Sequence, residues 1–132
     1  MIAAFRAILL AANPVASIVG QRIYPGVKPL NEREPSIVLR LVSDIPDYHF
    51  AGPSGFSSGR MQVECYAVTY AAALSLANAA KTALEQFVGT SASQPIGWIE
   101  LSDFFDIDVV VEDGANKPAE YGIQFDAEYL KI

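Results

Sequence analysis

The chain has 132 residues, a net charge of −6 and a single cysteine. That length predicts one domain, residues 1–132, able to bury a core without metals, and one cysteine excludes an internal disulfide framework. Hydrophobic residues make up 52% of the chain, yet the uncharged stretch of residues 66–80 is too short to cross a bilayer. An apolar excess without a membrane span predicts surface that is hidden in an oligomer or complex.

The N-terminal segment, residues 2–12, predicts an amphipathic helix because its larger apolar side chains recur on one helical face. A secretory signal is the alternative. It is disfavoured because Arg6 lies inside the apolar stretch and no basic region precedes it. Asn13 and Pro14 suit the N-cap and first position of a second short helix, which we expect to stop at Gly20.

A proline-led segment, residues 36–43, predicts the first clear strand, which is apolar on both faces and should be covered on both. The next residues, 44–58, show no regular period and predict a long flexible loop. Aromatic side chains among its glycines favour a loop that orders against a partner, and a mobile hairpin tip is the alternative. The candidate interface residues of this loop are Tyr48, His49, Phe50 and Phe56.

A strand followed directly by a long helix forms the centre of the sequence. Residues 61–67 alternate between apolar and polar side chains, which predicts a strand, and from Thr69 the apolar residues recur at helical spacing up to Val88. Two further strands are expected at residues 96–105, with a continuation to 111, and at 119–132. The latter alternates cleanly, which predicts one buried and one wet face.

These elements predict an α+β fold. We expect a mixed or mainly antiparallel sheet of about four strands, with one long helix packed on a face and a short N-terminal helix beside it. The order of the strands does not follow from the sequence.

No motif for catalysis or cofactor binding is present. There is no phosphate-binding glycine loop. Cys65 and His49 are the only candidates for a nucleophile and its base, and Cys65 alternates with apolar residues, as a small core residue would. We therefore predict no catalytic residues, no cofactor and no metal, and the chain is not expected to be an enzyme.

The C-terminal third is strongly acidic. Residues 100–132 carry two basic and nine acidic side chains, a net charge of −7, which argues against a surface that grips DNA phosphates. A hard-cation site, an acid–base pair and a solvated face are the alternatives to an acidic surface that binds a basic partner or repels a polyanion. The residues that carry the last hypothesis are Asp106, Asp108, Glu112 and Asp113.

Five pieces of the chain, taken in order, resemble a known family. They are the helix ending near VGQRIYP, the strand PSIVLRL, the loop with His49, the unit RMQVECYAVTYAAALSLANAAKTALE and the strand YGIQFDAEYL. This order is similar to that of the small tail-completion, or tail-terminator, proteins of long-tailed bacteriophages and prophages. Two other classes stay open: another head–tail adaptor or neck protein, and a small dimeric α+β ligand-binding domain.

The resemblance implies a structural role in the virion neck, after assembly in the host bacterial cytoplasm. Such proteins form a ring, commonly a hexamer, that caps the tail tube and joins it to the head connector or stopper protein. DNA passes through the ring without specific binding, and no membrane is involved. The acidic candidates named above would then face the lumen.

Overall fold

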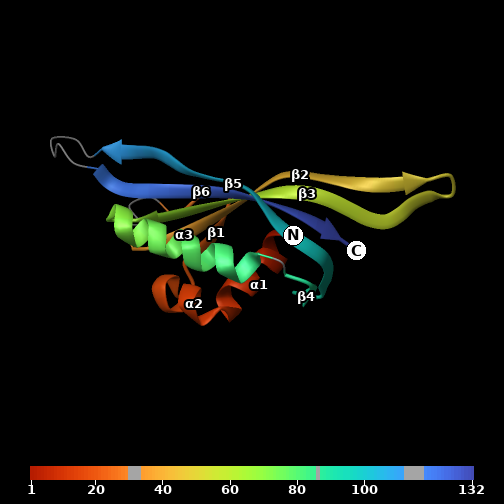
Figure 1. Cartoon of the computed structure of the whole chain (residues 1–132), viewed down its shortest axis with the longest axis horizontal. Helices are drawn as coiled ribbons and strands as arrows, with labels where there is room; N and C mark the ends of the chain where they lie inside the picture. Colours follow the sequence, from red (N-terminus) through yellow and green to blue (C-terminus); the bar gives the residue numbers. More distant parts are fainter. Residues whose placement is uncertain (30–33, 86, 112–117) are drawn as a thin grey trace.

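The computed structural model describes residues 1–29, 34–85, 87–111 and 118–132. Within these residues, three helices and six strands follow one another (Figure 1). They are α1 (Ile2–Ala11), α2 (Asn13–Val19), β1 (Ile23–Pro25), β2 (Ser36–His49), β3 (Gly52–Ala67), α3 (Tyr70–Leu84), β4 (Gly89–Ser91), β5 (Gln94–Val111) and β6 (Pro118–Lys131).

All six strands belong to one curled sheet with the order β1-β2-β3-β6-β5-β4. Only β1 and β2 run parallel; every other pair is antiparallel. The prediction of an α+β fold with a mixed sheet is confirmed, but its number of strands was wrong. The two additional strands, β1 and β4, have three residues each, which is too short to leave a periodic pattern in the sequence.

The three helices lie together on one side of the sheet, which we call the helix-covered face (Figure 1). Alternate residues of the long strands point into this core, and α3 packs on β3 and β6. Thr69 starts α3, since its hydroxyl accepts a hydrogen bond from the Ala72 N–H at 3.2 Å. The helix ends at Leu84, four residues before the predicted end, because Glu85 turns to an extended conformation.

The first two helices form the rest of the helical layer. Arg22 fixes the exit of α2, donating to the carbonyl oxygens of Ile18 at 3.0 Å and Pro35 at 2.9 Å. No single helix in the described ranges is long and apolar enough to cross a bilayer. α1 and α2 meet that criterion of length and composition only as a pair, which is bent by 97°.

We call the opposite side of the sheet the open face, because none of the helices in the described part of the chain lies on it (Figure 1). We predicted a wet face for β6, and this is only partly correct. Gln124 and Asp126 point to the open face but are 7% and 9% exposed, and Glu64 on β3 is 9% exposed. Polar side chains on neighbouring strands cover one another here, so the open face is polar without being fully solvated.

The segment 44–58 is not the long loop that we predicted. It forms the outer half of an antiparallel hairpin between β2 and β3, and only Phe50 and Ala51 turn the chain. Register shifts after Leu41 and Pro46 interrupt the pairing. These bulges, together with the glycines and prolines of the segment, conceal the strand period.

Candidate interaction surfaces

The arm, residues 44–58, projects beyond the rest of the sheet (Figure 1). The pairing of β3 with β6 ends where Ser57 faces Lys131, so the part of the arm beyond Ser57 consists of two strands only. A two-stranded hairpin without a third strand or a covering helix has little core of its own. An isolated hairpin of this kind is typical of a segment that acquires its contacts from a partner.

The tip of the arm is apolar and exposed. Tyr48 is 65% exposed and Phe50 is fully exposed, while Phe56 on the returning strand is 45% exposed. His49 lies beside them, and its Nδ1 accepts a hydrogen bond from the Ala51 N–H at 3.1 Å. The structure thus brings Tyr48, His49 and Phe50 together, and their role in an interface stays a prediction.

The root of the arm is held by a buried hydroxyl. Tyr129, on the helix-covered face, donates to Asp44 Oδ2 at 2.7 Å, and Lys131 Nζ lies 3.2 Å from the same oxygen. Burial alone would raise the pKa of Asp44, but the hydrogen bonds from Tyr129 and Lys131 outweigh it and hold that pKa below its usual value. Burial and the contact with Asp44 raise the pKa of Tyr129.

A glycine, Gly59, leaves room for the Tyr129 ring at the root of the arm. A Cβ atom at Gly59 would lie 2.2 Å from the backbone oxygen of Ser43 and 2.5 Å from the Tyr129 hydroxyl. No side chain fits there, so the Ser43 backbone oxygen and the Tyr129 ring can lie over residue 59 only because it is a glycine.

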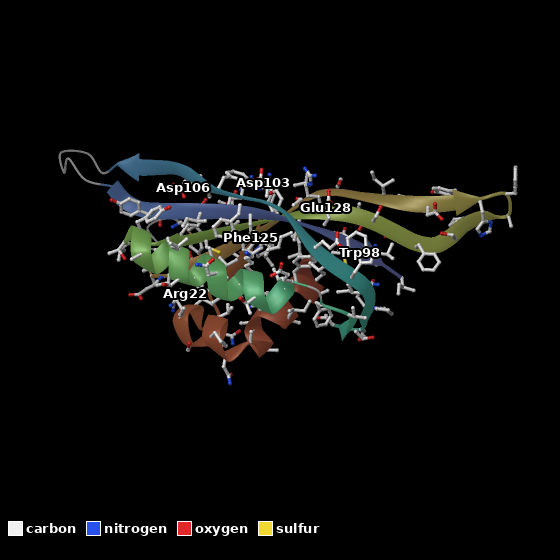
Figure 2. The ribbon with its side chains drawn as sticks, in the orientation of Figure 1. Arg22, Trp98, Asp103, Asp106, Phe125 and Glu128 are labelled. Atoms are coloured by element: carbon white, nitrogen blue, oxygen red, sulfur yellow. The ribbon has the colours of Figure 1, made fainter. Side chains whose placement is uncertain are left out.

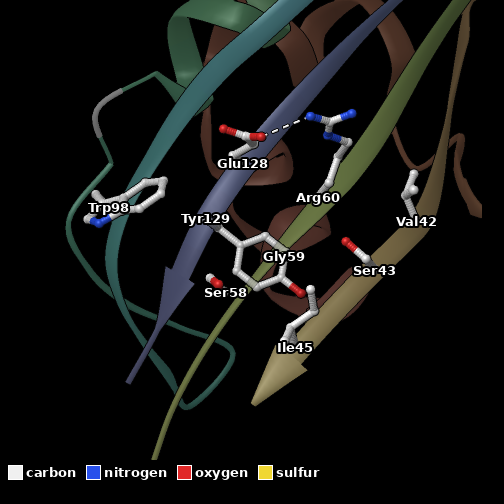
Figure 3. Close-up of a pocket in the computed structure, with 9 residues that line it drawn as sticks. All are labelled: Val42, Ser43, Ile45, Ser58, Gly59, Arg60, Trp98, Glu128 and Tyr129. Atoms are coloured by element: carbon white, nitrogen blue, oxygen red, sulfur yellow. Dashed lines mark hydrogen bonds and ion pairs between the residues drawn. The ribbon is translucent and has the colours of Figure 1, made fainter. Parts of the chain in front are cut away.

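A hollow of about 380 Å³ opens at the same root (Figure 3). Arg60 and Glu128 form an ion pair of 2.9 Å across it, and the Trp98 ring stands at its edge. Its lining residues are Val42, Ser43, Ile45, Ser58, Gly59, Arg60, Trp98, Glu128 and Tyr129. Charged and apolar groups share the hollow, and no nucleophile with an adjacent base lies in it.

The open face of β5 and β6 carries acidic side chains directly opposite one another. Glu100 pairs with Glu128, and Asp103 pairs with Asp126; Figure 2 shows Asp103 on the side of the sheet away from the helices. Like charges at facing positions destabilise a sheet. Arg60 offsets part of this repulsion at Glu128. We call these four residues the acidic ladder.

The four acidic residues chosen from the sequence do not form this ladder. The register shift at Ser102 reverses the phase of β5, so Asp106 pairs with Ile123 and points to the helix-covered face. There the Tyr70 hydroxyl donates to Asp106 Oδ1 at 3.0 Å, which raises the pKa of Tyr70. The side chain of Asp108, and Glu112 and Asp113 entirely, lie outside the described part of the chain.

The surface between α2 and α3 is lined without charged residues. A groove of about 460 Å³ runs between α2 and α3, and we call it the helix groove. It is lined by Ala12, Pro14, Asn78, Ala79, Thr82 and Ala83. A protein surface without charges is typical of an area that is covered in an assembly.

The two candidate catalytic groups do not meet. Cys65 is fully buried in the core, and burial raises the pKa of its thiol, whereas His49 is exposed at the tip of the arm. Among the residues that the structure describes, no group of three or more His, Cys, Asp and Glu side chains could hold a metal ion.

An exposed two-stranded arm, an acidic ladder and an uncharged helix groove, set around one small core, are features typical of a protein that works in an assembly. Comparison with known proteins gives the particular class: the family model of "Tail completion protein gp17" matches residues 3–110, and the chain belongs to this family. It is a structural tail protein of the phage type.

A solved structure shares the fold. The chain is similar to a protein in the structure titled "Virion of native gene transfer agent (GTA) particle", with a TM-score of 0.71 and 18% identity over 99% of this chain and 93% of that one. No curated protein matches the sequence.

Proposed function

We propose that the chain forms a homo-oligomeric, hexameric ring that caps the tail tube, joins it to the head connector or stopper protein, and lets DNA pass. The observation that carries the proposal is the family match over residues 3–110. The likeness to a protein of a virion particle supports the same setting. The exposed arm and the uncharged helix groove supply surfaces that a ring would cover.

Within this ring we propose that the acidic C-terminal part lines the channel. A wall of carboxylates repels the DNA phosphates, so DNA slides without adhering. The acidic ladder supports this proposal because its facing carboxylates are unfavourable for the isolated sheet. Asp106, Asp108, Glu112 and Asp113 belong to the same acidic segment and remain candidates for the lumen.

Solution mass tests the ring. A hexamer of this 14.2 kDa chain has a mass of about 85 kDa, which light scattering with negative-stain imaging of the same sample would detect. A dimer of about 28 kDa that gains thermal stability from small molecules would contradict the proposal and favour a ligand-binding domain.

Charge neutralisation tests the channel. In particles carrying Glu100→Gln with Asp103→Asn, we expect DNA delivery to fall by roughly tenfold while the ring stays intact. The same test applies to the amide variants of Asp106, Asp108, Glu112 and Asp113. The control is Glu85→Gln on the helical side, which should leave DNA delivery unchanged. Unchanged infectivity in both acidic sets would refute the lumen assignment.

A further inference from the structure

We propose that the arm tip of one subunit inserts into the helix groove of a second copy of the chain. This inference rests on the ring proposed above and adds the contact that links neighbouring subunits. The two partners in the contact are the aromatic side chains of Tyr48 and Phe50 and the small side chains around Ala79 and Thr82.

The arm tip needs a partner. Phe50 exposes its whole ring, and Tyr48 and Ile45 expose about two thirds of their surface, at 65% and 64%. Removing apolar surface from water is favourable, so exposed aromatic rings at the end of an arm favour association with a partner that covers them. Aromatic side chains are also the residues that most often anchor protein interfaces.

The helix groove is the hollow that matches this tip in polarity. The hollow at the arm root contains the Arg60–Glu128 ion pair. A third hollow, of about 140 Å³, is lined partly by four charged side chains: Lys28, Arg40, Glu64 and Glu120. Burying an aromatic ring in either would take charges out of water, which is costly. The helix groove has no charged lining residue, and its volume of about 460 Å³ exceeds that of these two hollows. A hollow of equal volume is lined by Tyr48, His49 and Phe50, which are the arm tip itself.

The geometry requires two copies. Beyond Ser57 the arm adds five residues of β3 before the turn, a reach of about 17 Å past the end of β6. Figure 1 shows the arm extending away from the helical layer, so its tip does not reach the groove of its own subunit. A contact between two unlike surfaces is heterologous, and repetition of such a contact generates a ring when the rotation closes.

Disulfide trapping between two differently sized versions of the full chain tests the contact. One version carries Phe50→Cys and the other Thr82→Cys; the native Cys65 is fully buried and stays in place. We expect a mixed disulfide to form at least tenfold faster than with the control partner Glu100→Cys, which is exposed on the open face. An equal rate with both partners would overturn the inference.

Association measurements separate this contact from the ring itself. We expect Phe50→Ser and Thr82→Arg each to weaken self-association by roughly tenfold or more, and Val27→Ser, at another exposed apolar site outside the arm, to leave it unchanged. Circular dichroism confirms that each variant is folded. A wild-type oligomer that resists both variants would overturn the inference and leave the ring standing. A wild-type monomer that traps no disulfide would refute both.

Discussion

Replacing Tyr129 by phenylalanine removes one hydroxyl from the root of the arm and leaves the rest of the side chain in place. The ring is fully buried and lies edge-on to Phe5 at 5.9 Å, and this packing is unchanged in the variant. The lost contact is the 2.7 Å hydrogen bond to Asp44. The substitution therefore measures how strongly this bond holds the arm to the sheet.

The structure sets the size of the effect. A hydrogen bond to a charged acceptor contributes about 1.5–3 kcal/mol to the net free energy of unfolding. The Asp44 side chain keeps 24% of its surface exposed and also keeps Lys131 as a partner, so water and the ammonium group replace part of what is lost. We expect Tyr129→Phe to lower the free energy of unfolding by about 1–1.5 kcal/mol at pH 7.

The loss should depend on pH. The folded-state pKa of Asp44 is below its unfolded value, so the stabilisation from this carboxylate is complete above the unfolded pKa and is lost as pH falls through the folded one. Protonated Asp44 is a weaker acceptor, and the difference between wild type and Tyr129→Phe should shrink toward pH 2.

Urea unfolding at a series of pH values measures both quantities. Tyr121→Phe is the matched control, because the Tyr121 hydroxyl has no hydrogen-bond partner among the described residues; we expect it to change stability by less than about 0.5 kcal/mol. The reasoning is refuted if the two variants lose the same stability, or if the loss in Tyr129→Phe is as large at pH 2 as at pH 7.

Two further substitutions test the packing. Gly59→Ala places a Cβ atom 2.2 Å from the Ser43 backbone oxygen, and thermal unfolding should show a loss of about 2 kcal/mol or more, against less than about 0.5 kcal/mol for Ser58→Ala next to it. Leu76→Ala leaves a cavity at a fully buried position of α3 and should lower the free energy of unfolding by about 2–5 kcal/mol, measured by urea unfolding. A loss below about 1 kcal/mol would show that α3 is not anchored there.

The elements with a sustained period were predictable. The alternation of β3 and the helical spacing after Thr69 both appear in the structure, because each pattern extends over at least seven residues. The short edge strands β1 and β4 were missed, since three residues carry no period. The position of α3 on β3 and β6 depends on contacts between residues that lie far apart in the sequence. A single sequence does not show which distant residues meet.

The arm was located by its aromatic residues, but its conformation was predicted wrongly. Pro46 and Pro53 in a strand normally argue against pairing. Here Pro46 lies on β2 where that strand is an edge of the sheet, and Pro53 lies in the two-stranded part of the arm, so fewer backbone N–H groups are needed at both positions. The acidic ladder was missed for a related reason. A bulge of one residue, Ser102, changes which acidic side chains share a face, and such bulges have no reliable sequence signature.

Two of the bulges, at Val42 and Ser102, also explain how one sheet presents its surfaces in different directions. A single row of paired residues crosses the four long strands, and these residues are Leu41, Met61, Ala127 and Leu101. The bulge at Val42 lies next to this row on the side of the arm. The bulge at Ser102 lies next to it on the side of the other end of the sheet. Bulges increase the local twist, and Figure 1 shows the strands crossing near the middle of the sheet. Beyond the crossing the arm leaves the helical layer, whereas the acidic ladder straddles the row on the open face, with Glu100 and Glu128 on the arm side of the row and Asp103 and Asp126 on the other side.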